Sequence, residues 1–269
     1  MGIAFEKWQG LGNHYVVTEG VAWPFPITPD RARLVCDPNF GVGSDGILEI
    51  VISDEIPEMR VWNPDGSRAE NCGNGIRMVS RYLHGRGMLP SDGRVLTGAG
   101  EVTVSVDGSV VSVDMGLATF PSGQREESLG TGEGEVTLAE VSMGNPHAVI
   151  RHDDPDAAVS VLGPLVEVAE RFPDRTNVEF IRRDGPSEIT MRVWERGAGV
   201  TMACGTGACA AAVAGVALDG LQSPVTVHLA GGDLIIEVDD DLRVTMTGPA
   251  DPIYSGQMSA ELMSRLEAM

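Results

Sequence analysis

The sequence predicts an α+β fold made of two copies of one unit, and three observations carry this prediction. Segments starting at Met59 and Met191 read MRVWNPDGSRAENCGNGI and MRVWERGAGVTMACGTGA, and the 132-residue offset between them holds without a gap. Alternating β-type sequences follow at the same offset, GEVTVSVDGSVVSVDMG from Gly100 and GDLIIEVDDDLRVTMTG from Gly232. In each copy, a stretch with helical spacing of apolar or small residues lies between the repeated segment and the β-type sequence that follows it. We therefore expect two pseudo-symmetric halves, each a β-rich unit around a central helix, with the active site in the cleft between them.

The repeat also predicts the domain boundaries. The two copies cover about residues 1–116 and 140–248, so we expect an N-terminal half over 1–117 and a C-terminal half over 118–248. The stretch 121–135 is rich in Gly, Ser and Glu and has no apolar periodicity, which is typical of a linker.

In each copy a strand leads through a glycine-rich loop into a helix. The strands are expected at 59–62 and 191–194, and the first helix at about 73–83 with apolar residues at helical spacing. The second helix, at 205–218, is small or apolar on every face. We therefore expect it to be buried on all sides.

Composition excludes several classes of protein. The chain of 269 residues has 39 acidic and 19 basic residues, so its formal charge is −20. Such a surface repels nucleic acids and anionic lipids, and we expect neither as a partner. Lys7 is the only lysine. Since pyridoxal phosphate needs a lysine for its Schiff base, the composition disfavours that cofactor, and we expect none.

The four cysteines form no disulfide scaffold and no C-x-x-C pair, and the five histidines show no metal-ligand spacing with them. No signal-peptide pattern stands at the N-terminus, and no apolar stretch is long enough to cross a bilayer. We therefore expect a soluble cytoplasmic protein with reduced thiols, no metal and no membrane contact.

The duplication places one cysteine at the same point of each copy, Cys72 before Gly-Asn-Gly and Cys204 before Gly-Thr-Gly. A thiol at the entry of a helix faces unpaired N–H groups and the positive end of the helix dipole. This setting is expected to lower the cysteine pKa and give a thiolate near neutral pH. The glycines let a ligand approach the backbone, and the free N–H groups suit a carboxylate. Cys36 and Cys209 occupy no matched position and are expected to be buried apolar residues.

Two thiols on opposite faces of one carbon atom suit stereochemical inversion by proton transfer. One thiolate removes a proton from one face, and the other thiol returns a proton to the opposite face. The copies differ beside these thiols, because Asn63 and Pro64 of the first copy correspond to Glu195 and Arg196 of the second. Glu195 and Arg196 are candidates to hold an ammonium and a carboxylate; the alternative is a surface ion pair.

Several stretches resemble the diaminopimelate epimerase family in order and spacing: GLGNHYVV, NPDGSRAENCGNGIR, SMGNPHAV, NVEF and ERGAGVTMACGTGACA. The resemblance spans nearly the whole chain and implies a fold of two pseudo-symmetric halves, with the segment after about residue 248 (249–269) returning to the first. It further implies a cofactor-independent epimerase of LL- and meso-diaminopimelate on the route to lysine and peptidoglycan, acting in the cytoplasm on a small molecule, often as a homodimer.

The resemblance implies roles for individual residues. Cys72 and Cys204 are the acid/base pair, and the α-carboxylate binds at the turns Gly73-Asn74 and Gly205-Thr206. His147 and Glu195 match positions that tune the thiol pKa values. The rest of the substrate is held by a polar set consisting of Asn13, Asn63, Asn145, Asn177, Glu195 and Arg196. For the asparagines near Gly or Pro, a role as turn formers is the alternative.

Some positions depart from the family pattern. Gln9 stands where histidine is usual, and His14-Tyr15 replaces Asp-Phe. Gly46 stands where some members use a glutamine to touch substrate. Two other functions remain open: a racemase of a smaller amino acid such as proline, which Asn74 disfavours, and a thiol redox protein that uses Cys72 and Cys204 as a reversible disulfide.

Overall fold

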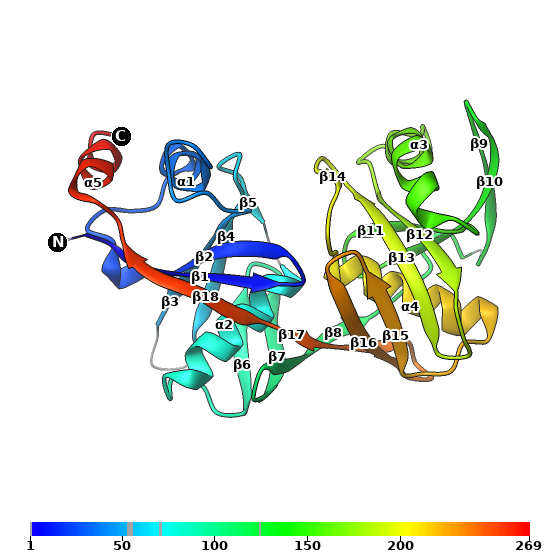
Figure 1. Ribbon diagram of the computed structural model, residues 1–269. Coiled ribbons are helices and arrows are strands. Elements are labelled where there is room, and N and C mark those ends of the chain that lie inside the picture. Colours follow the sequence, from blue (N-terminus) through cyan, green and yellow to red (C-terminus); the bar gives the residue numbers. More distant parts are fainter. Residues whose placement is uncertain (1, 53–55, 70–71, 124) are drawn as a thin grey trace. The chain divides into compact units, whose positions relative to one another are not determined.

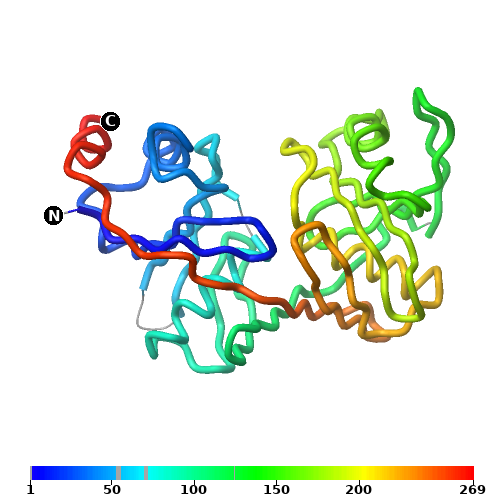
Figure 2. Tube along the Cα trace, viewed as in Figure 1, coloured from blue at the N-terminus to red at the C-terminus, as the bar shows by residue number. Residues whose placement is uncertain are grey.

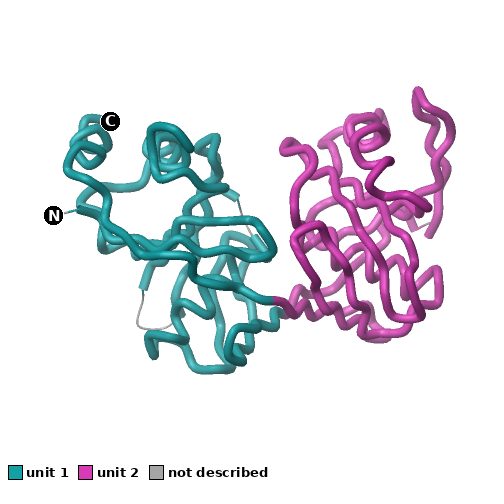
Figure 3. The backbone as a smooth tube through the Cα atoms, in the orientation of Figure 1, with its two compact units in different colours: residues 1–113, 249–269 teal, residues 114–248 magenta. Residues whose placement is uncertain are grey.

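The structure, a computed structural model, describes residues 2–52, 56–69, 72–123 and 125–269 (Figure 1). The chain divides into unit 1, residues 1–113 with 249–269, and unit 2, residues 114–248 (Figure 3). It leaves unit 1 through strand β8 (Val110–Leu117) and returns through β17 (Arg243–Pro249), as Figure 2 traces. The first boundary therefore lies inside a strand, four residues before the expected position after 117.

Unit 1 is a β-sheet with helices on both faces. Its sheet runs in the order β18-β1-β2-β3-β4-β6-β7-β8, with β2–β3 and β4–β6 parallel and the other pairs antiparallel. Its other elements are β1 (Ala4–Gly10), β2 (Asn13–Glu19), η1 (Gly20–Ala22), α1 (Pro29–Cys36), β3 (Ile47–Val51), β4 (Glu58–Trp62), β5 (Arg68–Ala69), α2 (Gly73–Gly85), β6 (Asp92–Thr97), β7 (Gly100–Asp107), β18 (Asp251–Gln257) and α5 (Ala260–Glu267).

Unit 2 repeats this topology. Its sheet runs β9-β10-β11-β12-β13-β15-β16-β17, with β11–β12 and β13–β15 parallel and the other pairs antiparallel. Its other elements are β9 (Glu127–Thr131), β10 (Gly134–Ser142), β11 (Pro146–Arg151), α3 (Pro155–Glu167), β12 (Asn177–Arg183), β13 (Glu188–Glu195), β14 (Gly199–Val200), α4 (Gly205–Asp219), β15 (Val225–Leu229) and β16 (Gly232–Val238). The α+β class and the duplicated architecture predicted from the repeat are thereby confirmed.

The helix of each repeat packs on one face of its own sheet. Helix α2 contacts β1, β2, β3, β4 and β7, and α4 contacts β10–β13, β15 and β16 (Figure 1). The first three turns of α4, from Gly205 to Gly215, are buried except at Thr206. Ala and Gly dominate these turns, and their small side chains let the strands of the sheet approach the helix closely. The predicted burial of this helix is confirmed, although its last turn is only half-buried.

Other helices pack on the face of each sheet that lies away from α2 or α4. In unit 1, α1 and α5 pack there with sheet residues such as Phe5, Val16 and Ile47. In unit 2, α3 packs on residues such as Ile150 and Phe180. Since side chains alternate along a strand, the neighbouring residues of the same strands face α2 and α4. Each sheet therefore has an apolar core on both of its faces. The helices that begin directly after Cys72 and Cys204 pack on the face opposite to α1 and α5 in unit 1 and to α3 in unit 2.

The expectation of a linker over 121–135 is wrong. Strand β9 and the start of β10 occupy its second half, where Glu127–Thr131 pairs antiparallel with residues 134–138. Within the stretch 121–135, Leu129 is partly buried against the apolar cluster under α3; the other cluster residues of this hairpin, Val136 and Leu138, follow in β10. A half-exposed outer strand needs few apolar residues, because backbone hydrogen bonds to its neighbour hold it. This is why periodicity did not reveal it.

Within the described residues, no helix is long and apolar enough to cross a membrane. All four cysteines are free thiols: Cys36, Cys204 and Cys209 are buried and Cys72 is half-buried.

Candidate active site

Cys72 stands at the N-terminus of α2 in unit 1. Its backbone is extended (φ −151°, ψ 106°), and its Sγ accepts a hydrogen bond from the backbone N–H of Gly75 at 3.3 Å. A Cβ on Gly75 would lie 3.3 Å from this Sγ and 2.8 Å from Cδ2 of Leu48. The first turn of α2 can therefore close over the thiol only because position 75 has no side chain.

Asn74 is fixed from two sides in the first turn of α2. Its Nδ2 donates to Oδ1 of Asn13 at 3.2 Å, and its own Oδ1 accepts from Nη2 of Arg77 at 2.8 Å. Arg77 is fully buried and also donates to the carbonyls of Gly73 and Pro249. Sequence reasoning missed Arg77; its signal is an arginine among the apolar residues directly after the CGNG motif.

Asn63 lies in the turn after β4 and is half-exposed. Its Nδ2 donates to Oγ of Ser67 at 2.9 Å, and its backbone N–H donates to the Ser67 carbonyl, also at 2.9 Å. These contacts are those of a turn former.

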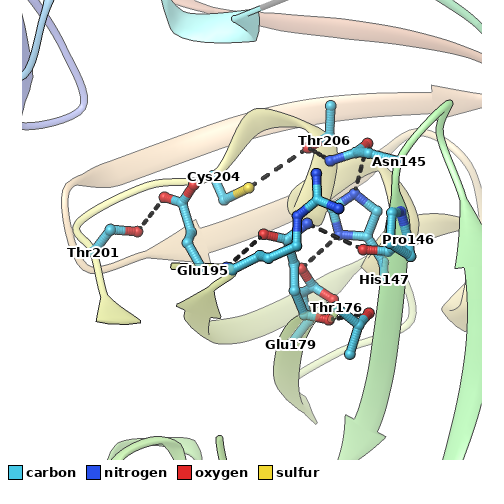
Figure 4. Close-up of polar contacts among 11 residues, drawn as sticks. Asn145, Pro146, His147, Thr176, Glu179, Glu195, Thr201, Cys204 and Thr206 are labelled. Atoms are coloured by element: carbon cyan, nitrogen blue, oxygen red, sulfur yellow. Dashed lines mark hydrogen bonds and ion pairs between the residues drawn. The ribbon is translucent and has the colours of Figure 1, made fainter. Parts of the chain in front are cut away.

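Cys204 occupies the matched place at the N-terminus of α4 in unit 2 (Figure 4). The residue is 7% exposed, and Oγ1 of Thr206 lies 3.6 Å from its Sγ. A Cβ on Gly207 would lie 3.3 Å from this Sγ and 2.6 Å from Oε1 of Glu179. As in unit 1, a glycine in the first turn lets the helix end approach the strand beside it.

A buried histidine–glutamate pair lies close to Cys204 in unit 2. Nδ1 of His147 lies 2.7 Å from Oε1 of Glu179, and both side chains are fully buried. Nε2 of His147 lies 3.1 Å from Oδ1 of Asn145, and Nδ2 of Asn145 donates to Oγ1 of Thr206 at 3.4 Å (Figure 4). Polar contacts therefore run without a break from Glu179 to the Cys204 thiol.

Glu179 is a site residue that sequence reasoning missed. It is fully buried in the centre of β12, and its Oε2 has no hydrogen-bond partner among the described residues. The signal was a carboxylate in the apolar strand NVEF, since a buried charge normally needs a partner.

Burial raises the pKa of the Cys204 thiol well above its usual range, and the negative charges of Glu195 and Glu179 raise it further. Hydrogen bonds to Thr206 and to the backbone of Gly207 oppose this only in part. The expectation of a lowered cysteine pKa is therefore wrong for Cys204. Two carboxylates and a dry environment outweigh the helix end.

Glu195→Gln should lower the pKa of Cys204, because the change removes a negative charge that disfavours the thiolate while it keeps the size of the side chain. The measurement is a pH titration of the protein labelled at cysteine Cβ, followed by NMR. Glu188→Gln, an exposed position on the same strand, is the matched control. An unchanged titration of Cys204 in Glu195→Gln would contradict the electrostatic account.

The loop after β13 carries Arg196, and the side chains of Asn177 and Glu167 bond its backbone. Oδ1 of Asn177 accepts from the backbone N–H of Arg196 at 3.0 Å, and its Nδ2 donates to the Pro146 carbonyl at 3.0 Å. Glu167, which sequence reasoning also missed, accepts from the backbone N–H of Gly197 at 2.8 Å. The guanidinium of Arg196 is exposed and donates to the backbone carbonyl of Asp174 at 3.3 Å.

Equivalent positions of the two units carry different side chains around each thiol. Val17 pairs with Leu48 in unit 1 as Val149 pairs with Glu179 in unit 2, so Leu48 and Glu179 are structural equivalents. At the 132-residue offset, Tyr15 corresponds to His147, Asn63 to Glu195 and Asn74 to Thr206. Unit 2 therefore surrounds its thiol with carboxylates and an imidazole, whereas unit 1 offers neutral groups at the same places.

Two of the departures from the family pattern have structural contacts in unit 1. Gln9 accepts from the backbone N–H of Gly12 at 3.2 Å and donates to Asp251 at 3.2 Å, which closes the β1–β2 turn. The backbone N–H of His14 donates to Oδ2 of Asp45 at 2.8 Å. Within the described part of the chain, no three His, Cys, Asp or Glu side chains are grouped to hold a metal ion.

Comparisons with known proteins agree with this geometry. The family model described as diaminopimelate epimerase matches residues 5–121 and 139–253. A diaminopimelate epimerase of Alkalilimnicola ehrlichii is 42% identical over 96% of this chain and 99% of its own length. One of Pelotomaculum thermopropionicum is 45% identical over 94% of this chain and 98% of its own length.

Solved structures show the same fold at low identity. A PhzF-family phenazine biosynthesis protein of Bacillus anthracis has a TM-score of 0.74 at 13% identity, covering 96% of this chain and 99% of its own. A probable proline racemase of Agrobacterium radiobacter has a TM-score of 0.72 at 13% identity, covering 96% and 93%. The family match over both halves, together with the paired CGNG and CGTG helix entries, shows that this chain belongs to the diaminopimelate epimerase family.

Proposed function

We propose that this chain interconverts LL-2,6-diaminopimelate and meso-diaminopimelate, a step of lysine biosynthesis, by proton transfer at the α-carbon without a cofactor. Identities of 42% and 45% to diaminopimelate epimerases over nearly the full chain support the substrate. The observation that carries the mechanism is the matched pair of thiols, Cys72 and Cys204, each at the entry of the central helix of its unit.

The helix entries supply the electrostatic part of the mechanism. The α-proton of an amino acid is a very weak acid, so the site must stabilise the carbanion that forms when the proton leaves. The first turns of α2 and α4 present backbone N–H groups of Gly73-Asn74 and Gly205-Thr206, and such groups bind a carboxylate and the charge that develops on it.

The groups around the two thiols support different resting roles for them. Cys204, which faces Glu195 and Glu179, starts the reaction as the protonated thiol and donates its proton. Cys72, with Leu48 and Asn63 at the equivalent positions, starts as the thiolate and accepts the α-proton. After one turnover Cys72 carries the proton and Cys204 is the thiolate, so the reverse reaction uses the same groups in exchanged roles.

The remaining polar residues hold the rest of the substrate. The exposed guanidinium of Arg196 suits the distal carboxylate, and Glu195 suits an ammonium. Asn13 and Asn145 each bond the second residue of a helix, Asn74 and Thr206 respectively, and so orient the groups that meet the substrate. Asn63 and Asn177 act with them by fixing the turns beside each thiol.

The test is α-proton exchange in deuterated water without added cofactor. We expect deuterium at the α-carbon and interconversion with LL-diaminopimelate, and neither with proline or with lysine, which lacks the distal carboxylate. A requirement for a cofactor, or turnover of proline as efficient as that of diaminopimelate, would overturn the proposal. Activity with a dithiol reductant and none with amino acids would instead indicate a thiol redox protein.

The proposal includes a homodimer and a cytoplasmic location, which the family resemblance implies. Light scattering on the purified chain tests the first, and fractionation of the source cells tests the second. A monomer at the concentrations used in the exchange assay would remove the homodimer from the proposal and leave the chemistry intact.

A further inference from the structure

Tyr15 brings a phenol hydroxyl to the Cys72 thiol. It lies on strand β2, its residue is 9% exposed, and its Oη is 3.5 Å from Sγ of Cys72. The backbone on both sides of Tyr15 is fixed, since the N–H of His14 donates to Asp45 and the N–H of Val16 donates to the Gly46 carbonyl. The hydroxyl is therefore presented to the thiol from a rigid strand.

Gly46 provides the space for this ring. A Cβ at position 46 would lie 2.7 Å from Cε1 of Tyr15 and 2.6 Å from the carbonyl oxygen of Trp62. The ring of Tyr15 thus occupies the volume that a side chain at position 46 would need. Tyr15 and Gly46, which depart separately from the sequence pattern, form one structural feature beside Cys72.

The position of Tyr15 has a counterpart in unit 2. Tyr15 is the equivalent of His147, which in unit 2 pairs with the carboxylate of Glu179, whereas the equivalent of Glu179 in unit 1 is Leu48. In unit 1 the strand beside the thiol therefore carries a phenol hydroxyl in place of an imidazole–carboxylate pair.

A phenol can bond either form of the thiol, but not equally well. A neutral S–H is a weak donor to the phenol oxygen, whereas a thiolate accepts the phenol O–H in a charge-assisted hydrogen bond, which is about twice as strong as a neutral one. In the structure the Cys72 thiol donates to Oη of Tyr15 at 3.5 Å. Once the thiol ionises, the phenol O–H becomes the donor, so the same contact stabilises the thiolate relative to the thiol. The N–H of Gly75, at 3.3 Å from the same sulfur, acts in the same direction.

We infer that Tyr15 is a positioning residue that holds Cys72 as a thiolate by donating its hydroxyl hydrogen bond to Sγ. Its meaning for catalysis rests on the proposed function, in which Cys72 is the resting base. The hydrogen bond itself does not depend on the substrate, so it can be tested without turnover.

The test is the pH dependence of Cys72 alkylation by iodoacetamide, read by mass spectrometry of the Cys72 peptide in the full-length chain. Since only the thiolate reacts, the midpoint of the rate profile reports the thiolate equilibrium. Tyr15→Phe removes the hydroxyl and keeps the ring. We expect the midpoint to move up by about one pH unit, the size typical of one lost hydrogen bond to a charged group.

Tyr82→Phe is the matched control. Tyr82 is the other buried tyrosine of unit 1, and its hydroxyl donates to Glu19 at 2.9 Å, away from Cys72. This variant should leave the Cys72 midpoint unchanged. An unchanged or lowered midpoint in Tyr15→Phe, or an equal shift in both variants, overturns the inference.

In a second experiment, the phenol of Tyr15 is made a stronger hydrogen-bond donor instead of being removed. The chain has three tyrosines, so 3-fluorotyrosine incorporated into a Tyr82→Phe/Tyr254→Phe background is placed at Tyr15 alone. Fluorination makes the phenol a better donor, and the Cys72 midpoint should fall; a rise or no change contradicts the inference.

Turnover then separates this inference from the proposed function. In Tyr15→Phe we expect the acidic limb of the pH profile of kcat/KM to move up by the same amount as the alkylation midpoint, with little change in KM. If the alkylation midpoint moves and the wild-type chain does not epimerise diaminopimelate, the hydrogen bond is supported and the proposed function fails. If the wild-type chain epimerises and the alkylation midpoint does not move, the proposed function stands and Tyr15 has no such role.

Discussion

Cys72→Ala and Cys204→Ala should each abolish epimerisation of diaminopimelate to within the limit of a sensitive assay. General acid–base catalysis by one group contributes about 10²–10⁴-fold to a rate, and in this mechanism each thiol is indispensable, because one must remove a proton and the other must supply one. Each variant is therefore expected to lower kcat by about 10³-fold or more. The measurement is the conversion of LL- to meso-diaminopimelate, followed by chiral chromatography.

Cys36→Ala is the control for this pair of variants. Cys36 is buried in unit 1, and its Sγ lies 3.5 Å from Oγ of Ser44. Its loss should leave kcat within about twofold, since only a small buried contact is removed. Epimerisation that survives in either Cys72→Ala or Cys204→Ala would show that the two thiols are not the acid/base pair.

His147→Ala should destabilise the chain strongly. The variant leaves the carboxylate of Glu179 fully buried without its imidazole partner, and it also removes a contact to Asn145. Removal of one partner from a buried ionic or hydrogen-bonded pair typically costs about 3–5 kcal/mol in the free energy of unfolding. Urea denaturation followed by circular dichroism measures the change.

His228→Ala is the exposed counterpart. Nδ1 of His228 lies 2.8 Å from Oδ1 of Asp233, but the two side chains are 37% and 60% exposed. A pair in contact with water contributes about 0–1 kcal/mol, so this variant should change the unfolding free energy little. A loss for His147→Ala no larger than that for His228→Ala would mean that the buried pair does not stabilise unit 2.

The internal repeat predicted more of the fold than the separate elements did. Strands β4 and β13, helices α2 and α4 and the hairpins β7–β8 and β16–β17 are all local patterns, and their common offset showed that they belong to two copies of one unit. The missed strand β9 has no such pattern, because its place is set by hydrogen bonds to β10 and Leu129 is its residue that packs against the core.

Some residues of the site could likewise be identified from the sequence, and others could not. Cys72 and Cys204 could be identified from sequence, because a motif fixes a thiol at the start of a helix wherever the helix packs. Arg77, Glu167 and Glu179 could not, because their importance lies in contacts across the sheet or to segments distant in sequence. The direction of the Cys204 pKa shift was also mispredicted, since it depends on burial and on two carboxylates that the chain brings to the thiol only on folding.

The sequence by itself therefore determined the duplicated architecture, the family and the matched thiols at the helix ends, all of which rest on local pattern and spacing. Only the tertiary structure decided how the two thiols differ. It places Glu179 and Glu195 around Cys204 and the hydroxyl of Tyr15 beside Cys72. The physical reason is that a helix end is a local feature with the same sign in both copies, whereas desolvation and neighbouring charges depend on which side chains the folded sheet brings within a few ångströms.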